Sequence, residues 1–213
     1  MKLFSKNKLL IKKTIKLYPL FWPKLYSTLR SLILPVSEIE SLLPKTGSVL
    51  DVGCGYGLTT VYFAQQSPLR HMEGIELNRQ RIKIAKIASK KINNIHFSVD
   101  DLANKQQGNY DAIVAIDLLH HLNQYQKNQL LSKCYDLLKP DGTLIIKDIN
   151  TSPILKYIWN YVHDYLMTFG STLAFLKSTD MIRLIENFNF KIITVNSIPN
   201  LFYPHIIYVF KKN

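Results

Sequence analysis

A short glycine-rich segment is the part of the sequence best suited to chemistry. Residues 49–57 read Val-Leu-Asp-Val-Gly-Cys-Gly-Tyr-Gly, so a buried-strand pattern runs directly into three glycines at alternate positions. Glycine permits positive φ and close approach of a ligand to the backbone, and the helix expected next offers unpaired N–H groups. The spacing differs from the Gly-x-Gly-x-x-Gly of dinucleotide folds. The segment predicts a cofactor-binding loop.

Carboxylates follow at the ends of the next two predicted strands. Glu76 lies 19 residues beyond Gly57, where a carboxylate can accept both hydroxyls of a ribose. The alternative is that Glu76 is an exposed acid that caps the following helix. Asp100 and Asp101 end the third strand, and one of them can accept the exocyclic amine of adenine. These positions together favour a nucleoside-containing cofactor.

The end of the fourth predicted strand carries titratable residues. It reads Ile116-Asp117-Leu118-Leu119-His120-His121. Because histidine has a near-neutral intrinsic pKa, His120 or His121 could act as a general base or position an acceptor. The alternative is that one ring packs against the cofactor and the other caps the helix at 124–138. Asp148 ends the fifth strand, and we expect it to form a structural ion pair with Lys147, Lys156 or Arg183.

The elements that must position these residues alternate between strand and helix. Apolar runs such as residues 111–116 indicate a mainly parallel sheet with helices on both faces. Ser37 and Glu40 suggest a capping box, and Lys139-Pro140-Asp141-Gly142 predicts a turn. The predicted strands are 48–52, 71–75, 95–99, 111–116, 142–149, 190–196 and 205–210, and the predicted helices are 38–43, 57–66, 78–91, 124–138, 152–168 and 178–187.

Because of these motifs, residues 36–150 resemble class I S-adenosylmethionine (SAM)-dependent methyltransferases. The glycine loop resembles their first motif, Gly74-Ile75-Glu76-Leu77-Asn78 their acidic second motif, and Val99-Asp100-Asp101-Leu102 their adenine motif, which favours Asp101 over Asp100. The resemblance implies a Rossmann-like α/β fold with a seven-stranded sheet whose last strand is antiparallel. It implies SAM as cofactor and these cofactor-binding residues: Asp51, Gly53, Cys54, Gly55, Gly57, Glu76, Leu77, Asp100, Asp101, Leu102 and Asp117.

The C-terminal third suggests an acceptor class. Residues 146–153, 156–160 and 203–205 are similar to small bacterial methyltransferases associated with fatty-acid, polyketide or aryl-polyene biosynthesis. That similarity implies a lipid-like, aromatic or carrier-bound acceptor. Several aromatic residues could line an apolar acceptor pocket or belong to the core, namely Tyr157, Trp159, Tyr161, Tyr165 and Phe169. The spacing of Asp117, Asp148 and Asn150 does not match a catechol-type metal site, so we expect no metal.

The charge of the chain is concentrated at its start. Eight of the lysines and arginines precede Glu38, the first acidic residue, in a chain of 213 residues with a net charge of +12. Such an arm attracts phospholipid head groups or nucleic acid. We predict a basic, aromatic-rich helical arm at 1–35 and a methyltransferase domain at 36–213. The arm packs over the sheet or the cofactor mouth, or it lies as a helix on a membrane surface.

Two cysteines, Cys54 and Cys134, form no disulfide framework, which suits a reducing compartment. We therefore predict a cytoplasmic protein, at the inner membrane face if the arm binds lipid. Two other functions stay open. The basic arm allows RNA ribose methylation, whereas amino-directed and cytosine-C5 enzymes lack support because the fourth strand end carries no proline. A non-catalytic SAM-binding protein is the third interpretation.

Overall fold

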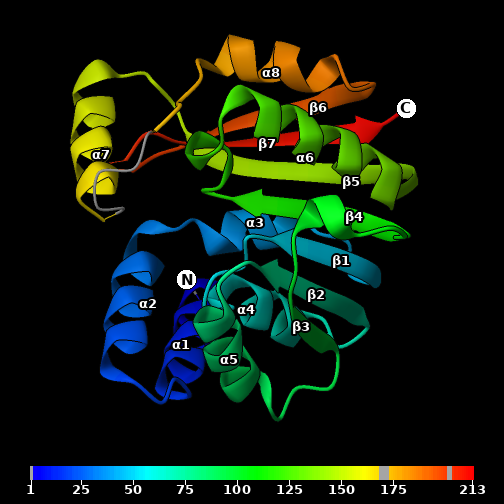
Figure 1. Cartoon of the computed structure of the whole chain (residues 1–213). Coiled ribbons are helices and arrows are strands. Elements are labelled where there is room, and N and C mark those ends of the chain that lie inside the picture. The colour runs from blue at the N-terminus through cyan, green and yellow to red at the C-terminus, as the bar shows by residue number, and fades with distance from the viewer. Residues whose placement is uncertain (1, 168–172, 201–202) are drawn as a thin grey trace. The chain divides into compact units, whose positions relative to one another are not determined.

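The computed structural model describes residues 2–167, 173–200 and 203–213. Its strands form a seven-stranded sheet in the order β3-β2-β1-β4-β5-β7-β6 (Figure 1). The last strand, β7, is antiparallel to both of its neighbours, as the family resemblance implied. The strands are β1 (Gly47–Val52), β2 (Arg70–Glu76), β3 (Ile95–Val99), β4 (Tyr110–Ile116), β5 (Leu138–Ile149), β6 (Phe190–Ile198) and β7 (His205–Lys212).

The helices confirm the predicted strand–helix alternation, and the fold is Rossmann-like α/β. Two helices occupy the predicted N-terminal arm. The α-helices are α1 (Lys2–Lys16), α2 (Phe21–Ile33), α3 (Val36–Leu42), α4 (Leu58–Gln66), α5 (Arg79–Ser89), α6 (Gln124–Leu137), α7 (Ile154–Met167) and α8 (Ser178–Glu186), with short 3-10 helices η1 (Leu102–Asn104) and η2 (Leu119–His121). The chain divides into two compact units, residues 1–105 and 106–213. The domain boundary predicted after residue 35 stays a prediction.

The first unit contains three parallel strands. Residues Val49–Val52 of β1 are all buried, as a strand covered on both faces requires. Strand β1 pairs with β2 so that Val52 lies opposite Ile75, and β2 pairs with β3 so that Glu76 lies opposite Val99. The carboxyl ends of these strands therefore meet at one edge, where ligands bind in open α/β sheets.

A buried ion pair ties α3 to this sheet. The Arg70 guanidinium, which is fully buried, lies 2.7 Å from Oε2 of Glu40 and also donates to the carbonyl of Pro44 at 2.6 Å. The predicted capping box at Ser37 is therefore wrong. Helix α3 begins at Val36 with Pro35 as its N-cap. The Glu40 carboxylate points to Arg70, because a buried guanidinium must be neutralised.

The second unit contains a parallel pair, β4 and β5, followed by two antiparallel pairings. Strand β5 begins at Leu138, four residues before its predicted start, so the predicted turn at residues 139–142 lies inside the strand. The left-handed backbone is nevertheless present, with φ of 62° at Asp141. The register with β4 shifts between Tyr110 and Ala112, because extra residues of β5 bulge out of the pairing.

Helix caps fix where helices begin in each unit. The Asn78 side chain accepts from the N–H groups of Gln80 and Arg81 at the start of α5. At the start of α6, Asn123 and Gln126 form a reciprocal capping box. In the part of the chain that the structure describes, no helix is long and apolar enough to cross a membrane.

Candidate functional site

The glycine loop follows β1 in the first unit. The backbone N–H groups of Gly53 and Cys54 both donate to the carbonyl of Ile75, at 2.9 and 3.0 Å. The Gly57 N–H donates to the carbonyl of Cys54 at 2.9 Å, and α4 begins immediately afterwards. These bonds attach the loop to the end of β2, so the two predicted cofactor motifs are joined through the backbone.

Gly55 and Gly57 have different structural roles in the loop. Gly57 has φ of +76°, and a Cβ there would lie 2.6 Å from Cζ of Phe97 and 2.9 Å from Cβ of Ala85. Gly55 has φ of +57°, but a Cβ there would meet nothing within 4 Å. Gly57 therefore permits close packing of the loop on the core. Gly55 borders open space, where a ligand can approach the backbone.

Glu76 is fixed against this loop. Its Oε2 accepts from the Gly55 N–H at 3.2 Å, and its Oε1 accepts from the Asn78 N–H at 3.0 Å. Arg81 lies 3.7 Å from Oε2, and the Glu76 side chain remains 13% exposed. An ionised carboxylate offers about four acceptor positions, so both oxygens retain capacity for two ribose hydroxyls. The structure thus brings together Gly55 and Glu76, as the sequence predicted.

Asp51 and Cys54 point inward. The Asp51 carboxylate is buried and accepts from the hydroxyls of Thr60 at 2.6 Å and Thr59 at 3.2 Å, which connects β1 to the first turn of α4. Burial raises the pKa of Asp51 to about 6, and the two hydroxyl hydrogen bonds oppose that rise. The Cys54 thiol packs in an apolar cluster that includes Phe97, and burial raises its pKa. A thiol in that environment is unreactive.

The predicted adenine-side residues lie at the ends of β2 and β3. Leu77 is 68% exposed, and Leu102 is buried. Oδ1 of Asp101 accepts from the Ala103 N–H at 3.0 Å and so begins η1. The Asp100 N–H donates to the Glu76 carbonyl at 3.3 Å, which holds the two strand ends together. Ligand contacts by these residues stay predictions.

Aromatic side chains from α2 and from the segment between α1 and α2 contact the loop, which the motif analysis did not find. The Tyr18 hydroxyl donates to the carbonyl of Tyr56 at 3.0 Å. The rings of Tyr26 and Tyr56 meet edge to face at 5.5 Å, and the Arg81 guanidinium lies 5.7 Å from the Tyr56 ring centre. The aromatic-rich composition of residues 18–26 was the one sequence signal that could have pointed to these contacts. The contacts of Tyr18 and Tyr26 show that one side of the arm packs on the glycine loop.

The second unit contains a buried histidine–carboxylate pair. Nδ1 of His120 lies 2.5 Å from Oδ1 of Asp148, and both side chains are only 2% exposed. The expected partners of Asp148 are therefore wrong. Lys147 pairs with Asp117 instead, and Lys156 donates to the Asn200 carbonyl at 2.6 Å. Residues 120 and 148 meet because β4 and β5 are adjacent and parallel, and this pairing also places Asp117 beside Lys147.

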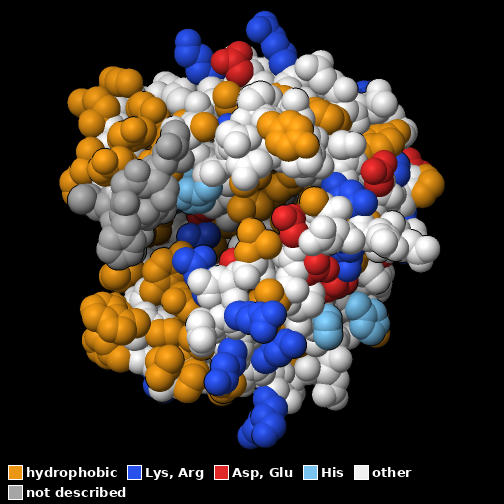
Figure 2. All heavy atoms as spheres, in the orientation of Figure 1, with side chains coloured by type: hydrophobic (Ala, Val, Ile, Leu, Met, Phe, Trp, Pro, Cys, Tyr) orange, Lys and Arg blue, Asp and Glu red, His pale blue; other side chains and the backbone are white. Residues whose placement is uncertain are grey.

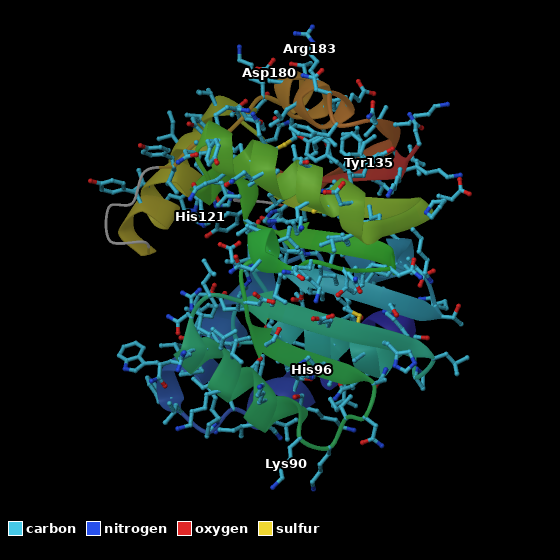
Figure 3. All side chains as sticks on the ribbon, turned by 45° about the vertical axis from the view of Figure 1, so that its right-hand side comes forward. Lys90, His96, His121, Tyr135, Asp180 and Arg183 are labelled. Atoms are coloured by element: carbon cyan, nitrogen blue, oxygen red, sulfur yellow. The ribbon has the colours of Figure 1, made fainter. Side chains whose placement is uncertain are left out.

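An aromatic cluster surrounds His120. The Phe175 ring stacks on His120 at 4.7 Å, and the Tyr157 ring meets Phe175 edge-on at 5.5 Å. His121 follows on η2 with its ring centre 4.0 Å from that of His120, but His121 is exposed (Figure 3). The two predicted catalytic candidates thus differ. His120 is a buried, carboxylate-bound ring, and His121 is an accessible one.

Lys127 is a buried lysine that sequence reasoning missed, and it forms a hydrogen bond with the backbone next to this cluster. Nζ of Lys127, from α6, donates to the Ala174 carbonyl at 2.7 Å, while the Ala174 N–H donates to the His120 carbonyl at 2.7 Å. Burial lowers the pKa of Lys127, and the charge of Asp148 opposes that effect. Residues 173–175 are therefore held beside η2 by two independent hydrogen bonds.

The aromatic residues predicted to line an acceptor pocket or to belong to the core lie in different surroundings. Tyr157 and Tyr161 both contact Phe175, whereas Trp159 and Tyr165 are 57% and 47% exposed. Phe169 lies outside the described residues. Among those residues, no group of three or more His, Cys, Asp or Glu side chains could hold a metal ion.

The fold and the loop define a nucleoside-binding α/β protein, and comparison with known proteins gives its family. The methyltransferase domain family matches residues 21–195. The chain belongs to this family and has the class I SAM-dependent methyltransferase fold, with SAM as its cofactor. The open space at Gly55 and the remaining acceptor positions of Glu76 fit that cofactor.

Relatives of similar sequence are small-molecule methyltransferases by name. The chain is 35% identical over 115 residues to phosphoethanolamine N-methyltransferase of Plasmodium falciparum, covering 53% of this chain and 42% of the relative. It is 26% identical over 149 residues to ubiquinone biosynthesis O-methyltransferase of Dechloromonas aromatica, covering 62% of each. The chain thus spans roughly four- to six-tenths of the length of these curated relatives.

Solved structures support the fold. The pyocyanin biosynthetic protein PhzM superimposes with a TM-score of 0.77 at 16% identity, covering 95% of this chain and 62% of that one. Magnesium protoporphyrin IX methyltransferase from Synechocystis, solved with bound S-adenosylhomocysteine, gives a TM-score of 0.67 at 20% identity, covering 84% of this chain and 81% of that one.

Proposed function

We propose that this protein transfers a methyl group from SAM to a hydroxyl or amine of a small molecule. The observation that carries the proposal is the buried His120–Asp148 pair with the exposed His121 beside it. A proton acceptor is needed when the acceptor atom is a weakly acidic hydroxyl or a protonated amine. The relatives named for phosphoethanolamine N-methylation and for O-methylation in ubiquinone biosynthesis support both acceptor types.

His121 is the general base in this proposal. When bound, SAM supplies a methyl group on a positively charged sulfur, and the electrons of the broken carbon–sulfur bond stay on that sulfur. His121 takes the proton from the acceptor oxygen or nitrogen, whose lone pair forms the new bond to carbon. We assign this step to His121 because it is exposed, whereas His120 is 2% exposed and bound to Asp148.

His120 is a positioning residue in the same proposal. Asp148 accepts the Nδ1–H of His120, which fixes the tautomer and the plane of that ring. The fixed ring then contacts His121 on one side and Phe175 on the other. The loss of either member of the buried pair would therefore disorder η2 rather than remove the base.

Aromatic or lipid-like compounds, free or attached to a carrier, are the acceptor class that we propose. Tyr157, Tyr161 and Phe175 form an aromatic group beside the histidines. Helix α7 also exposes Leu155, which is 79% exposed, and Trp159. Apolar and aromatic side chains near a few polar groups are typical of small-molecule sites. We further propose a cytoplasmic location, because both cysteines are free and buried.

The test is transfer of a labelled methyl group from SAM to separated cell fractions. The purified protein is incubated with a water-soluble extract, a lipid extract or total RNA. We expect label in the soluble or lipid fraction and none in RNA. Label in RNA alone would replace this proposal with ribose methylation. Binding of S-adenosylhomocysteine without transfer to any fraction would favour a non-catalytic SAM-binding protein.

A further inference from the structure

Helix α2 exposes its apolar face. Most amphipathic helices of globular proteins bury their apolar stripe, but α2 buries Pro23 and Ser27 instead. One continuous arc of the helix and the residue before it carries large exposed apolar side chains. Their exposed fractions are Leu20 56%, Phe21 70%, Trp22 72%, Leu25 36%, Leu29 52% and Leu32 76%. Figure 2 shows hydrophobic side chains gathered over α2.

Basic side chains accompany this face. Lys24 lies on α2 next to the apolar arc, and Lys12, Lys13 and Lys16 lie on the exposed side of α1; all four are exposed. No acidic residue occurs before Glu38, so no charge within the two helices neutralises these lysines. The exposed sides of α1 and α2, which we call the arm surface, therefore carry large apolar side chains on α2 and exposed lysines on both helices.

We propose that the arm surface docks on anionic phospholipid, with α2 lying in the plane of the membrane interface. Aromatic and leucine side chains enter the boundary between head groups and acyl chains, and lysines pair with lipid phosphates. Charge complementarity favours lipid over a second copy of the chain, because self-association through this surface would bring like charges together. Nucleic acid would satisfy the lysines but would leave the leucines exposed to water.

Docking would also place the cofactor loop at the lipid surface. Tyr18 lies between α1 and α2, Tyr26 lies within α2, and both contact Tyr56 of the glycine loop. These contacts lie within the first unit, so docking of the arm fixes the loop as well. The inference goes beyond the proposed function, and it stands even if the acceptor is not a lipid.

The first experiment measures binding of the full chain to vesicles. Neutral phosphatidylcholine vesicles are compared with vesicles of phosphatidylcholine and phosphatidylglycerol at low and high salt. We expect co-sedimentation with the anionic vesicles that weakens at high salt. Trp22 and Trp159 are the two tryptophans of the chain, so Trp159→Phe leaves Trp22 as a reporter. Its emission should shift to the blue when anionic vesicles are added.

Variants test each part of the surface. Trp22→Ser with Leu29→Ser, and separately Lys12→Gln with Lys13→Gln and Lys16→Gln, should each weaken vesicle binding at least tenfold. Leu69→Ser is the apolar control, since Leu69 is 69% exposed in the same unit. The charge control combines Lys83→Gln and Lys86→Gln, on the exposed side of α5, with Lys90→Gln at its C-cap. Every variant must still bind S-adenosylhomocysteine, which separates loss of docking from loss of folding.

Three results would overturn the proposal. The first is absence of binding to anionic vesicles by a protein that binds S-adenosylhomocysteine. The second is an equal loss of binding in the control variants. The third is a blue-shifted Trp22 without lipid in a self-associated protein, which would assign the arm surface to a second copy. In the first of these cases, tight and salt-sensitive binding of RNA would assign the arm surface to nucleic acid.

Discussion

The glycine loop of the first unit and the histidine cluster of the second unit use different chemistry. In the first, the groups available to a ligand are mostly backbone, arranged by glycines with positive φ and supported by Glu76. In the second, a buried histidine, a buried carboxylate and a buried lysine are held by one another and by backbone carbonyls. Backbone sites tolerate side-chain changes but not changes of φ, whereas side-chain clusters depend on each charged partner.

The largest expected effect tests the histidine cluster. His121→Gln should lower kcat by about 10²- to 10⁴-fold, the range typical for loss of a general base, and should leave S-adenosylhomocysteine binding unchanged. His96→Gln, an exposed histidine of β3 (Figure 3), is the matched control and should have no effect. Steady-state kinetics with the identified acceptor provide the measurement. An unchanged kcat in His121→Gln would remove the general base from the mechanism.

The second prediction tests the division of tasks within the glycine loop. Gly57→Ala should destabilise the fold by about 3 kcal/mol, because the new Cβ meets Phe97 in a left-handed backbone. Gly55→Ala should cost only about 1–2 kcal/mol from the backbone, yet should weaken S-adenosylhomocysteine binding. Denaturant unfolding and calorimetric titration measure the two quantities. Equal destabilisation by both substitutions would contradict the open space at Gly55.

The third prediction concerns pH. Burial raises the pKa of Asp51 to about 6 from its ordinary value of 3.8. The folded state therefore holds this proton more tightly than the unfolded state. The contribution of Asp51 to stability should fall as pH rises from about 4 to 6 and then level off. For a pKa rise of that size, the free energy of unfolding should fall by about 3 kcal/mol over this pH range.

Asp51→Asn isolates this effect. The variant should lose the decline between pH 4 and pH 6 and should gain stability relative to the native chain at pH 8. Urea unfolding across this pH range measures the difference. A difference between the two proteins that does not change with pH would show that Asp51 is ionised throughout.

The fourth prediction tests the ribose contact of Glu76. Glu76→Ala should weaken S-adenosylhomocysteine binding by about 2 kcal/mol or more, because it removes a charged hydrogen-bond acceptor and the anchor of the Gly55 N–H. Glu73→Ala, which removes another acidic side chain from the same strand, is the control. Calorimetric titration compares the three proteins. Micromolar binding by all of them would exclude Glu76 as the ribose acceptor.

The smallest expected effect compares the two units directly. Asn78→Ala in the first unit and Asn123→Ala in the second each remove an N-cap and should cost about 1 kcal/mol. If the chain unfolds in one transition, both variants should shift that transition equally. Two transitions, each moved by only one of the variants, would show that the units unfold separately.

Local sequence was sufficient to predict those features that depend on residues close together along the chain. Alternating glycines after a buried strand predict the loop, and strand–helix alternation predicts the α/β fold. Glu76 was found because a fixed spacing places it at the next strand end. The strand ranges were correct to within a few residues, except at β5. There, pairing with β4 extended the strand through residues that locally favour a turn.

Tertiary structure alone decided the partners of buried charges. Sequence placed Asp148 with a lysine or an arginine, whereas parallel pairing of β4 and β5 placed it beside His120. Arg70 with Glu40, and Lys127 with Ala174, likewise join residues far apart along the chain. A buried charge requires a partner, and any nearby group of suitable chemistry can serve. Sequence therefore determined the fold and the cofactor loop, but only packing determined which side chains meet.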